Sequence, residues 1–184
     1  MKQGKLNIEE IKSHICLTKD GEWNNRFGTN CYAFALGLDI PEKSFPFRAY
    51  QLGMFYVFQR GYNPNNFWFY PYEERLEKDL KTLKIEFKEV DPEVDNYCVK
   101  HEKNGKCDSI DYYWSIALFD GVMDFHFLRK GFDGKWYHKY GYFTSPVNHD
   151  RDNKIILDPR DCNIENYEYQ KTYQLKLTRK ESNE

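Results

Sequence analysis

The spacing of apolar residues in the first third of the chain follows the period of a helix. Apolar positions recur at helical intervals over residues 6–14 and predict a short amphipathic helix there. The apolar run CYAFALGL predicts a second helix at residues 31–38. Thr29 or Asn30 suits its N-cap and Gly37 suits its end, because these residue types satisfy the unpaired backbone groups of helix termini.

Two further helices are indicated by prolines, which favour the first turn of a helix. Pro46 predicts a helix over residues 47–60 that ends at Gly61, and Pro71 predicts another over residues 72–83. The N-terminal half of the chain is therefore expected to be mainly helical.

From residue 85 onward the apolar period becomes two, which is typical of strands with one buried face. Strands are predicted at residues 85–90, 112–119, 125–130, 135–139, 155–157 and 172–178, with a polar excursion over residues 91–110. The sequence GFDG at residues 131–134 predicts a tight hairpin turn between two of these strands. Helices followed by an antiparallel sheet predict an α+β fold, organised as a single domain over residues 1–184.

Composition refines this picture and excludes some function classes. The chain holds 15 Tyr, 14 Phe and 4 Trp, which predicts a bulky core that includes a sheet. The formal net charge of −2 gives no electrostatic reason to expect nucleic acid or a membrane surface as a partner. No apolar run approaches the roughly 20 residues that span a bilayer, and the first residues lack the apolar core of a secretory signal.

The five cysteines are an odd number, and none of them falls in a CxxC motif. This usage favours free thiols in a reducing compartment over a disulfide framework. We therefore expect a cytoplasmic protein, although delivery into another cell would leave no recognisable mark in the sequence. The oligomeric state is left open.

Cys31 is the first candidate for chemistry, because it opens the predicted apolar helix directly after a Gly-Thr-Asn loop. Unpaired N–H groups at a helix start lower the pKa of a thiol, and a nearby imidazolium lowers it further. The same N–H groups can stabilise an oxyanion on an attacked carbonyl. The position therefore suits a nucleophile.

His126 and His138 lie on the two strands that flank the predicted GFDG hairpin. The turn lies midway between them, so pairing around it brings position 126 roughly opposite position 138, with both side chains on one face. In this arrangement His126 would take the thiol proton as general base, and His138 would hold the His126 ring by a hydrogen bond. Asn148 or His149, in the loop TSPVNHD, is the alternative to His138.

The sequence Asn-Cys-Tyr-Ala at a helix start, followed by a strand His and a second His on the next strand, resembles the papain-like cysteine hydrolase superfamily. The Cys-His-His chain order is similar to that of NlpC-type peptidoglycan endopeptidases and their amidase relatives. The resemblance implies a papain-like fold with N-terminal helices packed on a C-terminal antiparallel sheet. It also implies Cys31 as nucleophile, His126 as base and His138 as third member.

The later stretch DFHFLRKGFDGKWYHKYGYFTSPVNHD is similar to papain-like domains of bacterial toxins and phage-associated proteins. The resemblance covers residues 24–38 and 112–159. It implies an oxyanion-hole amide six residues before the nucleophile, which is Asn25 here, and it finds Asn30 where the family commonly has Asp or Gly. The implied substrates are peptides or proteins cleaved at peptide, isopeptide or side-chain amide bonds, without a cofactor.

The remaining candidates also have purely structural interpretations. Tyr32, Trp136 and Tyr140 could line a substrate cleft or simply belong to an aromatic core. Asp124 could tune the His126 imidazole or form a strand-entry turn.

Cys98, His101 and Cys107 have zinc-like spacing, but the fourth ligand would have to be Asp108 or a distant residue, so no metal is expected. The alternative function is a catalytically inactive papain-like binding module, such as a phage-associated or toxin-associated inhibitor. In that case the aromatic-rich residues 45–70 would form the docking surface for a protein partner.

Overall fold

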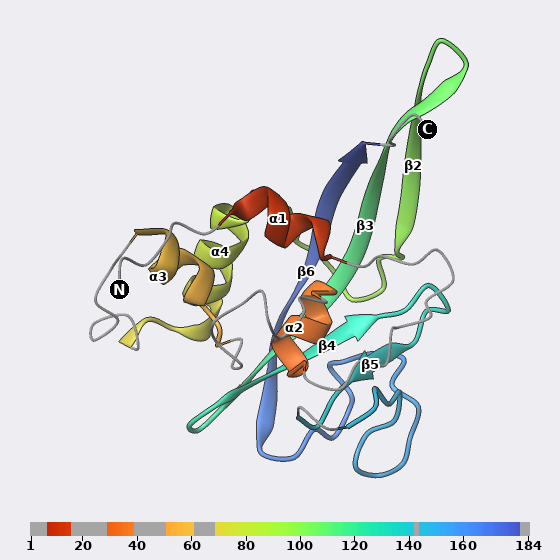
Figure 1. The fold of residues 1–184 in the computed structure, drawn as a ribbon. Coiled ribbons are helices and arrows are strands. Elements are labelled where there is room, and N and C mark those ends of the chain that lie inside the picture. The colour runs from red at the N-terminus through yellow and green to blue at the C-terminus, as the bar shows by residue number, and fades with distance from the viewer. Residues whose placement is uncertain (1–6, 16–28, 39–50, 61–68, 142–143, 181–184) are drawn as a thin grey trace.

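The computed structural model describes residues 7–15, 29–38, 51–60, 69–141 and 144–180 (Figure 1). The helices are α1 (Ile8–Ser13), α2 (Cys31–Leu36), α3 (Met54–Arg60) and α4 (Tyr72–Thr82). The strands are β1 (Glu86–Glu89), β2 (Tyr97–Lys103), β3 (Lys106–Gly121), β4 (Phe125–Lys130), β5 (Trp136–His138) and β6 (Tyr167–Lys180). Helices precede an antiparallel sheet, which confirms the expected α+β class.

The sheet is built on the long antiparallel pair of β3 and β6. Its order is β1-β6-β3-β4-β5, and β2 also pairs with β3. Residues 106–113 of β3 pair with β2, whereas residues 116–120 pair with β4. Residues 109–113 of β3 pair with β6 as well, and the tip of the β2–β3 hairpin projects beyond the end of β6 (Figure 1). β5 is short, pairs with residues 128–130 of β4 and forms one isolated bridge, between His138 and Val147.

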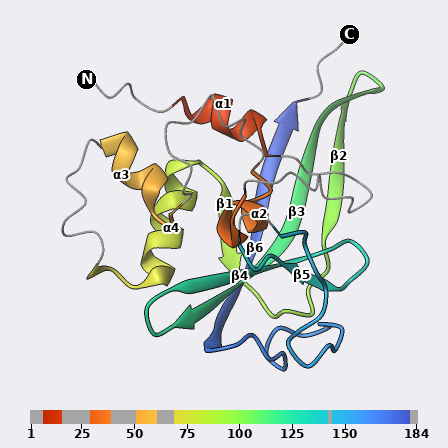
Figure 2. The ribbon, with the colours of Figure 1, turned by 60° about the horizontal axis from the view of Figure 1, so that its bottom comes forward.

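Different parts of the chain cover the two faces of the sheet. On one face, Trp114 and Ile116 of β3 pack in a core cluster with apolar side chains of α1, α2, α3 and α4. On the other face, Phe119 packs with Trp136 and with Ile164 from the segment between β5 and β6. Figure 2 shows α2 in front of the strands, with α3 and α4 beside one another at one flank.

α2 forms as the sequence predicts, because both of its ends are satisfied locally. The Asn30 side chain caps the N-terminus by accepting the Ala33 N–H at 2.9 Å. Gly37 ends the helix in the left-handed region with φ 71°. The indole N–H of Trp114 donates to the Ala35 carbonyl at 3.1 Å, which fixes the helix to the sheet.

Three predicted elements differ from the structure. Residues 51–53 form a turn rather than part of a helix, and residues 47–50 and 61 lie outside the described residues. The predicted excursion over residues 91–110 instead contains β2 and the start of β3. Most of β2 is exposed on both faces, so it lacks the alternation that signals a strand. Residues 155–157 contribute only an isolated bridge at Ile155 rather than a strand.

None of the described helices is both long enough and apolar enough to cross a membrane.

A buried carboxylate joins three helices behind the site. Asp79 of α4 accepts hydrogen bonds from the Tyr32 hydroxyl at 2.7 Å, the Gly53 N–H at 2.6 Å and the Tyr56 N–H at 2.9 Å. These donors come from α2 and from the start of α3. Burial is the main cause that raises the pKa of Asp79 from 3.8 to about 7.

We expect the stability of the protein to depend on pH through Asp79. Between about pH 4 and pH 7 the folded state keeps a proton that the unfolded chain has lost, so the free energy of unfolding falls as the pH rises. The decrease from this group is on the order of a few kcal/mol. Urea denaturation at about pH 5 and pH 7.5 measures it.

The control is Asp79→Asn, which keeps the shape of the side chain but cannot titrate. Its free energy of unfolding should lose this part of the pH dependence. An equal pH dependence in both proteins would contradict the assigned pKa.

Candidate functional site

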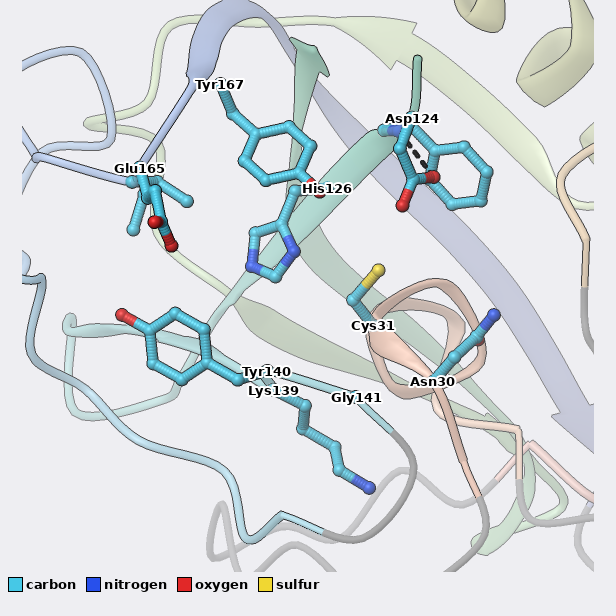
Figure 3. A pocket seen from close by; sticks show the side chains of 11 residues that line it. Asn30, Cys31, Asp124, His126, Lys139, Tyr140, Gly141, Glu165 and Tyr167 are labelled. Carbon is cyan, nitrogen blue, oxygen red and sulfur yellow. Dashed lines mark hydrogen bonds between the residues drawn. The ribbon is translucent and has the colours of Figure 1, made fainter. Parts of the chain in front are cut away.

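Cys31, His126 and Asp124 line one cavity of about 380 Å³ at the end of the sheet (Figure 3). Cys31 is the first residue of α2, and the other two residues belong to the start of β4 or to the turn before it. The remaining lining residues are Asn30, Phe125, Lys139, Tyr140, Gly141, Ile164, Glu165 and Tyr167. Residues remote in sequence therefore meet at the nucleophile candidate.

The Cys31 thiol contacts the backbone at the edge of β4. The N–H groups of Phe127, of Tyr32 and of Cys31 itself hydrogen-bond to the sulfur and lower the pKa of the thiol. Burial outweighs these hydrogen bonds, and the negative charge of Asp124 adds to the burial effect. Together they raise the pKa of Cys31 from 9.0 to about 12. The resting thiol is therefore protonated, contrary to the lowered pKa expected from its place at a helix start.

His126 and His138 are in direct contact. His126 Nε2 lies 2.9 Å from His138 Nδ1, and His138 Nε2 lies 3.0 Å from the backbone carbonyl of His149. A carbonyl only accepts, so His138 donates from Nε2 and accepts at Nδ1. His126 then donates from Nε2 and keeps a lone pair on Nδ1. The predicted contact is confirmed, while the catalytic roles stay a prediction.

The register of the hairpin differs from the predicted one. His138 lies opposite Leu128, not opposite His126. The two histidines still share a face because side chains on a strand alternate with a period of two. They reach each other diagonally across the strand pair, which is within range for imidazole rings.

Aromatic rings hold the imidazole of His126 in place. The Tyr167 ring lies 5.4 Å from it, and the Tyr140 ring lies 6.3 Å away in a stacked orientation. His138 also contacts Tyr140, at 4.5 Å between ring centroids. In Figure 3 the ring nitrogen of His126 that is not bonded to His138 faces Cys31.

The histidine pair is neutral in the resting site. Burial lowers the pKa of His126 from 6.5 to about 3, with a smaller effect from His138. Burial also lowers the pKa of His138. In the described part of the chain no hydrogen bond joins the Cys31 sulfur to the His126 ring. The site thus presents a neutral thiol and a neutral base, which can exchange a proton only when a reacting group develops charge.

The other predicted site residues fall in different places. Asn30 lines the cavity and caps α2, whereas Asn25 lies outside the described residues. Tyr32 and Trp136 are wholly buried in the two core clusters, which contradicts a role in lining the cleft. Each packs against apolar side chains of the sheet. Of the three aromatic candidates, only Tyr140 lines the cavity.

The alternatives to His138 are also resolved by position. Asn148 hydrogen-bonds to the Tyr137 hydroxyl through its side chain. His149 supplies its backbone carbonyl, not its ring, to His138. The ring of His149 lies 3.3 Å from the Asp150 carbonyl through Nδ1. His138 is therefore the residue that contacts His126.

Sequence reasoning missed Lys139, Glu165 and Tyr167. Lys139 is buried, and its ammonium donates to the carbonyl oxygen and the hydroxyl of Thr29 at 2.8 Å and 3.0 Å. Glu165 pairs with Arg151. Lys139 directly follows His138 at the end of β5, whereas Glu165 and Tyr167 lie just before β6 and at its start. The approach of Glu165 and Tyr167 to Cys31 depends on how the β5–β6 connection packs, which local sequence patterns do not encode.

The described residues contain no group of three or more side chains suited to holding a metal ion. His101, one of the zinc candidates, lies 2.9 Å from the Asp111 carboxylate through Nε2.

Comparisons of this chain with protein-family models, with curated proteins and with solved structures find no match.

We expect slow alkylation of Cys31 near neutral pH. Because only a thiolate attacks iodoacetamide, a thiol with a pKa of about 12 reacts slowly at about pH 6 and faster as the pH rises toward 10. Labelling rates of each cysteine, mapped by mass spectrometry across this range, test the expectation. A fast rate that is constant from about pH 5 to pH 8 would instead reveal a resting thiolate–imidazolium pair.

Proposed function

We propose that this protein is a cysteine-dependent hydrolase of amide bonds with a papain-like arrangement of helices and sheet. The observation that carries the proposal is the chain of hydrogen bonds from His126 to His138 to the His149 carbonyl, beside a cysteine that opens a helix. This series of hydrogen bonds fixes the tautomer in which His126 Nδ1 is unprotonated and can act as a base.

In the proposed reaction, Cys31 Sγ attacks the amide carbonyl while His126 Nδ1 takes the thiol proton. The imidazolium then gives this proton to the leaving amine as the C–N bond breaks, which leaves a thioester on Cys31. Water attacks the thioester and gives a proton to His126, and that proton returns to sulfur as the C–S bond breaks. His138 stabilises the transient imidazolium by accepting its Nε2–H.

The oxyanion formed during attack needs hydrogen-bond donors close to the sulfur. The backbone N–H groups of Cys31 and Tyr32 lie at the start of α2, beside the sulfur, and both lower the pKa of the thiol. We propose that they receive the oxyanion. The resemblance adds the Asn25 amide as a further donor.

The proposed substrate is a peptide or protein with a peptide, isopeptide or side-chain amide bond. A cavity of about 380 Å³ is large enough for one or two side chains beside the scissile bond. The cytoplasm stays the proposed location, and free thiols at Cys31, Cys98, Cys107 and Cys162 are compatible with it.

The alternative is a binding module that no longer catalyses. It is favoured by the protonated thiol and by exposed apolar side chains. Val122 and Met123 lie in the turn beside Asp124, and Phe69 lies just before α4. Phe69 and Tyr70 belong to the aromatic-rich residues 45–70, most of which lie outside the described residues. Such a protein would bind its partner without forming a thioester.

Acyl transfer to Cys31 distinguishes the two functions. With p-nitrophenyl acetate, an ester that needs no specific recognition, we expect release of nitrophenol and an acetyl group on Cys31 seen by intact-protein mass spectrometry. Cys31→Ser should lose the adduct, and His126→Ala should slow turnover by about 10²–10⁴-fold because the general base is missing. Acetylation of Cys107 as fast as that of Cys31, or turnover by His126→Ala equal to that of the wild type, would contradict the proposed hydrolase function.

His138 is expected to act as a positioning residue. His138→Ala should lower kcat by about 10²-fold because the His126 ring loses its orientation. His138→Gln, which keeps an acceptor, should restore part of the rate. His149→Ala is the matched control, since only its backbone carbonyl takes part. Equal losses of kcat in His149→Ala and His138→Ala, with unchanged thermal stability, would contradict the positioning role of His138.

A further inference from the structure

Asp124 places a fixed carboxylate in the wall of the cavity beside Cys31. It lies in the turn between β3 and β4, and its Oδ1 accepts the Phe125 N–H at 2.8 Å. The Tyr167 hydroxyl also hydrogen-bonds to this carboxylate. In Figure 3 the Asp124 side chain projects toward the same space as the Cys31 sulfur. The carboxylate is thus exposed, oriented and close to the nucleophile.

Among the described residues, Asp124 has no cationic partner, whereas the other charged residues of the cavity are already engaged. Glu165 pairs with Arg151, and the buried ammonium of Lys139 donates to Thr29. No ion pair joins Asp124 to any lysine, arginine or histidine in the described ranges. Asp124 is therefore the charged group of the cavity that remains available to a ligand.

Aromatic rings line the cavity that holds this carboxylate. Phe125, Tyr140 and Tyr167 all line the cavity with Asp124. Aromatic faces attract ammonium and guanidinium groups through their negative ring quadrupole, and a carboxylate adds a direct ion pair. Burial raises the pKa of both tyrosines, so they stay neutral at physiological pH. The Asp124 side of the cavity is therefore suited to a positively charged ligand group.

We propose that Asp124, with Phe125, Tyr140 and Tyr167, forms a subsite for a positively charged group that the substrate carries close to its scissile amide. That the bound molecule is a substrate rests on the proposed function, whereas the binding of a positively charged group follows from the residues that line the cavity. It narrows the substrate class to peptides or proteins with an amine or a guanidinium near the cleaved bond.

The subsite couples binding to activation of the thiol. The charge of Asp124 raises the pKa of Cys31, so the empty site disfavours the thiolate. A bound cation offsets this charge and makes transfer of the thiol proton to His126 easier. Of the other groups that face Cys31, His126 and the tyrosines are neutral. The Lys139 ammonium interacts with Cys31 but is held at Thr29, so its contribution is the same whether the subsite is empty or occupied.

Charged thiosulfonates test the subsite directly. A Cys31 thiolate attacks the sulfenyl sulfur of the reagent, a disulfide forms, and methanesulfinate leaves. We compare the rate at Cys31 for the cationic trimethylammonioethyl reagent, the neutral methyl reagent and the anionic sulfonatoethyl reagent. Relative to the rates at Cys107 in the same protein, the cationic reagent should react about tenfold faster than the neutral one. The anionic reagent should be slowest.

Substitutions at Asp124 test whether this residue causes the preference for the cationic reagent. Asp124→Asn should abolish it, and Asp124→Lys should reverse it in favour of the anionic reagent. Asp120→Asn is the matched control, because Asp120 is an exposed carboxylate on the same hairpin that does not line the cavity. No cationic preference in the wild type, or an equal preference in Asp124→Asn, overturns the subsite.

This experiment separates the subsite from the hydrolase. Thiosulfonate exchange needs only an accessible thiol, so it proceeds whether or not Cys31 forms a thioester. Acyl transfer to Cys31 without a charge preference would support the proposed hydrolase function and overturn the proposed subsite. A charge preference without acyl transfer would support the subsite and overturn the hydrolase.

Discussion

The site depends on the early end of β5. That strand pairs with residues 128–130 of β4 and leaves the first half of β4 without a strand on this edge. The backbone N–H of Phe127 is then available to the Cys31 sulfur, and α2 packs against β4 at the same place. A helix start replaces a strand as the neighbour of β4, which brings a thiol to the edge of the sheet.

This arrangement joins side chains from opposite faces of the sheet. Phe127 belongs to the core cluster under the helices, whereas Leu128 belongs to the cluster on the other face. His126 shares the face of Leu128, and Cys31 comes from the helical side. In the middle of a sheet, two such groups would be separated by a strand. At an open edge they can line one cavity.

Burial explains why the resting site is neutral. Cys31, His126 and His138 are each driven toward their uncharged forms. The two imidazoles bond to each other and to the His149 carbonyl, and His126 Nδ1 keeps its lone pair for a proton. Asp124 stands at the exposed side of the same cavity, where its charge remains solvated. Reactivity in such a site depends on what a ligand brings to it, because the site by itself favours no ion pair.

The sequence by itself determined the α+β class, the start and end of α2, the strand β4 and the hairpin that brings His126 to His138. These features follow from local patterns: a capping Asn30, a Gly37 that tolerates a left-handed conformation, and a tight turn between alternating segments. Only the tertiary structure decided the hairpin register, the burial of Tyr32 and Trp136, and the approach of Lys139, Glu165 and Tyr167 to Cys31. It also decided the protonation of the thiol. The physical reason is that register, burial and charge depend on which distant segments pack together, and local spacing carries no information about that packing.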